Sequence, residues 1–182
     1  HNGAFAVQSS VEQALHMEEK YLHSFSNPFQ AFVERVNKIK SEVLAFIQSE
    51  RNKGKTFYLM GASTKGNTLL QYFGLSNREI PFAAEVNREK FGRRTVGSNI
   101  LIISEEEAFK AHPNYFLVLP WHFIDNFIAK NQEYLKNGGK FLVPLPRPAY
   151  YDQDGVHFID QENKVAKETK VIISQKSIAT LI

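Results

Sequence analysis

The chain has 182 residues, of which 43% are hydrophobic and 23% charged, and its formal net charge is +3 at pH 7. This length and composition suit a globular domain with a sizeable core. Acidic and basic residues are interspersed, so we expect no nucleic-acid partner. The chain has no cysteine, which excludes disulfides and thiolate metal sites and is typical of a cytoplasmic protein. Its apolar runs are shorter than the roughly 20 residues of a membrane span, so we expect no membrane partner.

Two helices are predicted within residues 1–54. Val11 and Leu15 lie at helical spacing, and a longer amphipathic stretch runs from Pro28 to Gly54. We interpret this part as a helical segment that packs its apolar face on the rest of the protein. A partner helix or a homodimer interface is the alternative use of that face.

From residue 55 the pattern changes to short apolar strands that alternate with helices. Continuous apolar strands in this arrangement are typical of a parallel sheet covered on both faces. The sequence therefore predicts a doubly wound, mostly parallel α/β domain of the Rossmann-like type over residues 55–182. The expected strands are 56–60, 81–86, 99–103, 115–120 and 140–146, and the expected helices are 64–73, 104–112 and 123–136.

The last part of the chain is less regular. The stretches "GVHFID" and "KVIIS" look like strands. We expect them to form an antiparallel edge of the sheet.

The first candidate site is the turn between the first strand and its helix. In a doubly wound sheet, ligands bind beyond the carboxyl ends of the strands. Free amides at a helix N-terminus attract anions, and a lysine in the first turn adds a full positive charge. The turn fits neither the dinucleotide fingerprint nor the P-loop cleanly, so a purely structural turn is the alternative. The candidate binding residues here are Gly61, Ser63, Thr64, Lys65, Gly66 and Asn67.

Two further clusters follow later strands. Lys90 and Arg93 lie in a basic loop after the second strand, where they could flank a diphosphate beside the first turn; a solvated loop is the alternative. Trp121 and His122 follow the fourth strand, where an indole could stack on a base and an imidazole could donate a hydrogen bond. The remaining histidines lack metal-ligand spacing, so no metal site is predicted.

Four segments stand out in chain order: "GASTKGNTLLQYFGL", "NREKFGRRTVGSNILII", "NYFLVLPWHF" and "GGKFLVPLP". Together they resemble the C-terminal domain of sugar C-methyltransferases, which are S-adenosylmethionine-dependent enzymes acting on nucleotide-linked keto-sugars. The resemblance covers roughly residues 1–147, and it adds Asn87 to the candidate binding residues because this asparagine matches the family.

The resemblance implies a longer enzyme with three parts. A small zinc-binding domain and a middle domain that binds S-adenosylmethionine would precede the present chain, which would be the C-terminal part. The base and the oxyanion-stabilising group would lie in the middle domain, so no catalytic residue and no cofactor are expected here. This chain would bind the nucleotide diphosphate of the substrate and contact the upstream domain. Glu85 and Val86 stand where the family has Asp and Arg.

Two other functions stay open from the residues. Gly61, Gly66 and Glu85 could bind NAD in an oxidoreductase domain, although Ser63 replaces the middle glycine of that fingerprint. Alternatively, the domain has lost its ligand and serves as an interaction or dimerisation module.

Overall fold

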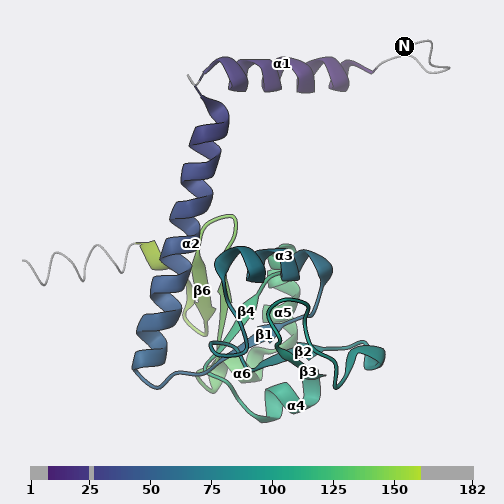
Figure 1. Ribbon diagram of the computed structural model, residues 1–182, viewed down its shortest axis with the longest axis vertical. Helices are drawn as coiled ribbons and strands as arrows, with labels where there is room; N and C mark the ends of the chain where they lie inside the picture. The colour runs from purple at the N-terminus through teal and green to yellow at the C-terminus, as the bar shows by residue number, and fades with distance from the viewer. Residues whose placement is uncertain (1–7, 25–26, 161–182) are drawn as a thin grey trace, which may run out of the picture. The chain divides into compact units, whose positions relative to one another are not determined.

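A computed structural model of the protein describes residues 8–24 and 27–160 (Figure 1). The chain divides into two compact units, residues 1–38 and 39–182. The division falls inside one helix, α2 (Pro28–Asn52), earlier than the boundary at residue 54 expected from the sequence. In the described residues, none of the helices combines the length and apolar character needed to cross a membrane.

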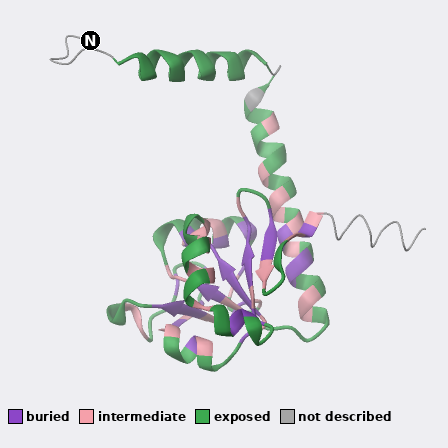
Figure 2. Cartoon of the chain, turned by 180° about the vertical axis from the view of Figure 1, so that it is seen from behind, coloured by how far each residue is buried: buried purple, intermediate pink, exposed green. Residues whose placement is uncertain are grey.

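The first unit contains α1 (Ser9–His23) and the beginning of α2. The side chain of Asn27 accepts a hydrogen bond from the backbone N–H of Gln30 at 3.0 Å and so caps α2. Helix α1 buries none of its residues, and Figure 2 shows it exposed along its length. Apolar side chains of this unit are therefore open to solvent, among them Leu15 with 60% and Phe32 with 56% of their surface exposed.

The second unit is built on a seven-stranded sheet with the order β3-β2-β1-β4-β5-β6-β7. Strands β1 to β5 are parallel, and β6 and β7 extend the sheet as an antiparallel edge, as expected. The strands are β1 (Phe57–Met60), β2 (Phe82–Glu85), β3 (Leu101–Ser104), β4 (Tyr115–Val118), β5 (Lys140–Val143), β6 (Ala149–Asp152) and β7 (Gly155–Phe158).

Helices cover both faces of the sheet, which confirms the doubly wound arrangement. On one face, α3 (Thr64–Phe73) and the second half of α2 pack against side chains such as Leu59 and Leu117. On the other face, the neighbouring strand residues Met60 and Val118 pack against the remaining helices. These helices are α4 (Glu105–Lys110), α5 (Ile124–Lys130) and α6 (Gln132–Lys136). The strands between the two helical layers are buried (Figure 2).

The apolar face of α2 is buried in the second half of the helix and exposed in the first half. Val43, Phe46 and Ile47 are buried in the core of the second unit, as the sequence predicts. Phe29 and Val33, nearer the start of the helix, keep 74% and 45% of their surface exposed.

Helices α3 and α4 are capped by local residues. Ser104 accepts from the N–H of Glu107, and the Glu107 carboxylate accepts from the N–H of Ser104, which completes a capping box. Helix α3 ends at Gly74, whose φ of 74° is the left-handed conformation that glycine adopts without strain.

The predicted helix 123–136 is interrupted. A short 3-10 turn, η2 (Trp121–Phe123), precedes α5, and Asn131 separates α5 from α6 with φ −122° and ψ 37°. The Asn131 side chain donates to the carbonyl of Phe127 at 2.9 Å and so competes with the helical backbone.

The C-terminal edge is a hairpin. Residues of the stretch "GVHFID" form β7, as predicted, and β6 is a strand that the sequence did not indicate. The predicted strand "KVIIS" lies outside the described residues.

Candidate functional site

The strand order reverses between β1 and β4, so this pair is the topological switch point of the sheet. Connections leave the two strands on opposite faces there, which opens a crevice at their carboxyl ends. A Cβ added to Gly61, directly after β1, would lie 3.7 Å from Cγ of Pro120. A Cβ added to Gly66 would lie 3.1 Å from Cδ1 of Leu119. The loops after β1 and β4 therefore meet at close range, and Gly61 enables the turn with a φ of 81°.

Helix α3 begins at this crevice. Ser63 has an extended backbone and is its N-cap; its hydroxyl accepts a hydrogen bond from the N–H of Gly66 at 3.0 Å. The amides of Thr64 and Lys65 have no acceptor within the helix, because the first turn has no preceding turn to bond to. Lys65 is exposed, so its charge adds to the positive end of the helix dipole.

Asn67 lies two positions after Lys65 in α3 and is partly buried. Its Oδ1 atom is buried and has no hydrogen-bond partner among the described residues. A buried acceptor without a donor costs about 1–3 kcal/mol. This atom therefore has an unused bonding capacity next to the predicted ligand site.

The loop after β2 meets the loop after β1 through Glu85, which is 8% exposed. Its Oε1 accepts from the N–H groups of Val86 and Asn87, and its Oε2 accepts from the N–H of Ala62 and from Nζ of Lys90 at 2.8 Å. Burial alone would raise the pKa of Glu85, but these hydrogen bonds outweigh it and lower the pKa. The carboxylate is satisfied within the protein.

Lys90 and Asn87 are both engaged in this loop. The ammonium of Lys90 pairs with Glu85 and also donates to the carbonyl oxygen of Ala62 at 3.1 Å. The side chain of Asn87 accepts from the N–H of Glu89 and caps the 3-10 turn η1 (Arg88–Lys90). Lys90 holds the loop against the turn after β1, and Asn87 fixes the local turn of the loop itself.

Arg93 lies elsewhere. Its segment pairs along the free edge of β3, where the N–H of Ile102 donates to the carbonyl of Arg93 at 2.9 Å. With β2 and β3 between this segment and β1, three strand spacings separate them, roughly 14 Å. Two strands of the sheet therefore separate the backbone of Arg93 from the turn after β1.

Trp121 and His122 follow β4 in η2, on the same edge of the sheet as α3 begins. Their rings lie 4.3 Å apart between centroids. Trp121 packs partly into the core and His122 is exposed. Trp121 is the only tryptophan in the sequence, so its fluorescence reports directly on this edge.

A cavity of about 360 Å³ opens beside Gly61, on the side of α4 and α5 and not of α3. The ends of β1 and β2 form one wall, and α4 and α5 with the turn before them form the other. Sequence reasoning did not find its helical wall, because those residues come from separate elements and share no motif. The lining residues are Gly61, Glu85, Val86, Glu105, Phe123, Asn126, Phe127, Lys130 and Asn131.

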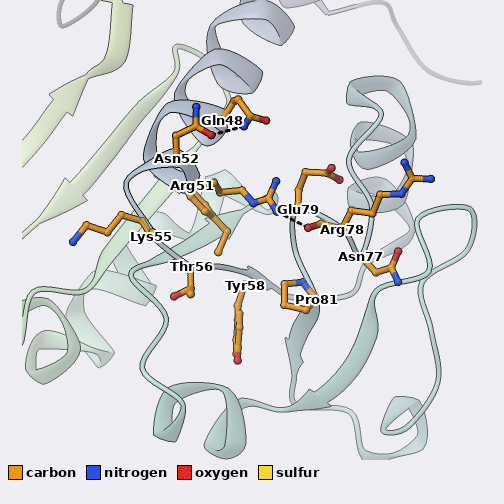
Figure 3. Close-up of a pocket in the computed structure, with 12 residues that line it drawn as sticks. Gln48, Arg51, Asn52, Lys55, Thr56, Tyr58, Asn77, Arg78, Glu79 and Pro81 are labelled. Atoms are coloured by element: carbon orange, nitrogen blue, oxygen red, sulfur yellow. Dashed lines mark hydrogen bonds between the residues drawn. The ribbon is translucent and has the colours of Figure 1, made fainter.

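A larger cavity of about 480 Å³ lies at the opposite edge, where β1 begins (Figure 3). Arg51 is held there by a hydrogen bond from its Nη2 to the carbonyl of Arg78 at 2.7 Å. The side chains of Lys55 and Arg78 point away from each other in Figure 3. The cations of this cavity do not converge on one point, so we place the candidate site at the carboxyl edge.

Within the part of the chain that the structure describes, no three histidine, aspartate or glutamate side chains gather to hold a metal ion. The donor sets at the carboxyl edge are hydroxyls, amides, single carboxylates and lysines. These groups recognise polar organic ligands and anions by hydrogen bonding.

Comparison with known proteins identifies the domain. The profile of the C-methyltransferase C-terminal domain matches residues 1–146. The chain belongs to this family. A curated relative, the C-methyltransferase NovU of Streptomyces niveus, is 32% identical over 142 residues, which are 78% of the present chain. The match covers 34% of that relative, so the chain spans about a third of its length.

The C-methyltransferase C-terminal domain matched by the profile includes β1 to β5 and ends before the hairpin of β6 and β7. The turn after β1, the loop after β2 and the η2 turn therefore all lie inside the matched region. The resemblance of the four sequence segments to the family is confirmed.

Proposed function

We propose that this chain is the part of a sugar C-methyltransferase that binds the nucleotide diphosphate of a nucleotide-linked keto-sugar. One observation carries the proposal: the N-terminus of α3 opens onto the switch point, where Gly61 lies against Pro120. Ligands of doubly wound domains bind at such a point.

The electrostatics of the first turn of α3 support a diphosphate there. Two free amides, at Thr64 and Lys65, point out of the helix N-terminus, and the dipole adds about half a positive charge. The Lys65 ammonium supplies a full charge. Gly66 lets α3 begin close against the loop after β4, because a Cβ there would lie 3.1 Å from Oγ of Ser63 and from Cδ1 of Leu119.

Asn67, Trp121 and His122 complete the proposed binding surface. The buried Oδ1 of Asn67 would accept from a ligand hydroxyl or amine. Trp121 offers a ring for stacking on a base, and His122 is exposed for hydrogen bonding. In this proposal Asn87 and Lys90 shape the site by holding the loop after β2, and Arg93 contributes nothing.

The chemical step is proposed to take place outside this chain. C-methylation of a keto-sugar requires a base to remove the proton next to the ketone and a group to stabilise the enolate. We assign the base and the enolate-stabilising group to the rest of the enzyme. The sites for S-adenosylmethionine and zinc are assigned there too. Glu85 does not fit a role in holding S-adenosylmethionine or NAD, because each oxygen of its carboxylate already accepts two hydrogen bonds from the protein.

The exposed apolar face of the first unit supports a role in assembly. Leu15, Phe29 and Phe32 are 60%, 74% and 56% exposed. We propose that the methyltransferase part of the same enzyme packs on this face, because the chain spans only a third of its relative. Light scattering of the 182-residue chain tests this: a monomer at all concentrations agrees with it, whereas a stable homodimer that Phe29→Ser with Phe32→Ser dissociates would contradict it.

The diphosphate proposal is tested by titrating UDP and dTDP into the 182-residue chain while recording calorimetric heat and Trp121 fluorescence. Loss of one well-placed charge contact weakens binding about tenfold, so Lys65→Ala should raise the Kd by about that factor. Lys110→Ala, at the end of α4, is the matched control and should bind like the wild type. The absence of any signal with either nucleotide in a folded chain would overturn the proposal, and a strong NADH response would favour the oxidoreductase alternative.

A further inference from the structure

The cavity between the ends of β1 and β2 and helix α5 has an unused carboxylate in its wall. Glu105 is the first residue of α4, is partly buried, and makes no hydrogen bond or ion pair within the described residues. Burial raises its pKa, Lys130 across the cavity lowers it, and Glu85 raises it again. Its neighbour Glu107 is occupied by the capping box, and Glu85 accepts four hydrogen bonds. The Glu105 carboxylate is thus a partly buried hydrogen-bond acceptor to which no described residue donates.

The other walls of the cavity are apolar or donate hydrogen bonds. Phe123, with 57% of its surface exposed, and the half-buried Phe127 both line the cavity. Lys130 carries an ammonium that makes no ion pair closer than 4 Å among the described residues, and Asn126 is exposed beside it. Aromatic faces with nearby acceptors and donors are the surroundings that suit a hydroxyl-bearing ring, whose C–H face packs on the aromatic ring while its hydroxyls bond to the polar groups.

The charges of the cavity argue against a phosphate in it. Glu85 and Glu105 line the space with Lys130, and Glu85 is already paired with Lys90, so the cavity has no excess positive charge to attract a phosphate. A carboxylate repels a phosphate, and the repulsion grows with burial. A phosphate would instead find two free amides and Lys65 at the start of α3, on the other side of Gly61.

Gly61 joins the two places. It lines the cavity and begins the turn into α3. A ligand that crosses the carboxyl edge at this glycine has its diphosphate at α3 and an adjoining ring in the cavity. At about 360 Å³ the cavity lies within the range of small-molecule sites, which is roughly 300–1,000 Å³.

We propose that this cavity seats a hydroxyl-bearing ring of the ligand, with Glu105 accepting a hydrogen bond from a ring hydroxyl and Phe123 packing on the ring face. This inference rests on the proposed nucleotide-sugar function and extends it to a second subsite. The ring is either the ribose of the nucleotide or the hexose beyond the diphosphate, since both offer the same hydroxyl chemistry.

The test is calorimetric titration of UDP and of UDP-glucose into the 182-residue chain and its variants. Glu105→Gln keeps the shape and loses the charge of the acceptor; we expect about fivefold weaker binding, from a charge-assisted hydrogen bond reduced to a neutral one. Glu106→Gln is the matched control, because Glu106 lies in the same helical turn, is exposed, and does not line the cavity. Phe123→Ala, at an exposed position, should weaken binding by a similar factor.

The possible outcomes distinguish a ribose from a hexose in the cavity. They also distinguish failure of the cavity inference from failure of the diphosphate proposal. Weaker binding of both ligands to Glu105→Gln assigns the cavity to the ribose, and weaker binding of UDP-glucose alone assigns it to the hexose. If UDP binds the wild type in a Lys65-dependent way but Glu105→Gln and Phe123→Ala match Glu106→Gln with both ligands, the cavity inference is overturned and the diphosphate proposal stands. If the wild type binds neither ligand, both fail.

Discussion

Lys90 donates a hydrogen bond to Glu85 at 2.8 Å and another to the carbonyl of Ala62 at 3.1 Å, so one ammonium fastens the loop after β2 to the loop after β1. The carboxylate that it meets also accepts the N–H of Ala62. Two loops that are distant in sequence are thereby held at the same edge of the sheet. The shape of the candidate site depends on this connection.

Removing the ammonium should loosen this edge. Lys90→Met is expected to lower the free energy of unfolding by about 1 kcal/mol, a modest amount because the Lys90 side chain is 37% exposed and its ion pair is screened by solvent. Lys110→Met, which removes an exposed lysine outside the loop, should change it by less than about 0.5 kcal/mol. Urea unfolding measures both. Equal effects of the two substitutions would show that the bridge contributes nothing.

The same site predicts a dependence of stability on pH. The pKa of Glu85 is lowered in the folded protein from its ordinary 4.5, so its contribution is complete above that value and is lost as the pH falls through the lowered pKa. Glu85→Gln should flatten the acid side of the stability curve and cost about 2 kcal/mol at neutral pH, because an amide nitrogen would then face backbone N–H donors. Urea unfolding from pH 7 to pH 3 measures this. A variant with the same acid slope as the wild type would refute the assignment.

Two adjacent glycines should respond differently to alanine. A Cβ at Gly139 would overlap ring atoms of Tyr134, whose hydroxyl is fixed by a bond to the carbonyl of Pro113 at 2.9 Å. We expect Gly139→Ala to cost about 3 kcal/mol. Gly138 has open space around it but a φ of 87°, so Gly138→Ala should cost about 1–2 kcal/mol through backbone strain alone. Thermal unfolding compares them, and the reverse order would contradict the packing at Tyr134.

The two halves of α2 should contribute unequally to stability. Phe46 packs against Tyr115 and Tyr150 with ring centroids 5.6 and 5.7 Å away, so Phe46→Ala should cost about 3–5 kcal/mol. Phe32→Ala removes the same side chain where 56% of it is exposed, and should stay within about 0.5 kcal/mol. Equal losses on denaturant unfolding of the 182-residue chain would mean that the whole helix shares one core.

Features set by neighbouring residues could be predicted from the sequence. The bounds of α3 follow from the Ser63 cap and the Gly74 stop, and the capping box of Ser104 and Glu107 is a local pattern. The interruption of the helix at Asn131 also has a local cause. It was not predicted, because the amphipathic pattern of apolar residues continues across it. Strand β6 follows a stretch with three prolines, which are poor strand formers, although Asp154-Gly155 marked its hairpin turn.

The candidate site was only partly predictable. Gly61 and Lys65 belong to one continuous turn that the sequence displays. The wall of the cavity joins Glu105 with Phe123 and Lys130 across separate elements, and such a meeting depends on the packing of α4 and α5 on the sheet. The path of the loop to Arg93 along β3 likewise depends on an edge pairing that charge and composition do not encode.

The central claim is that a nucleotide binds at the carboxyl edge, at the start of α3, and not in the larger cavity at the opposite edge. Amide ¹⁵N–¹H spectra of the 182-residue chain, recorded while UDP is added, test it most directly. The account predicts shifts of the Thr64, Lys65 and Gly66 amides and of the Trp121 indole, with those of Arg51, Thr56 and Arg78 unchanged. Shifts confined to the latter three residues, or none at any UDP concentration, would contradict it.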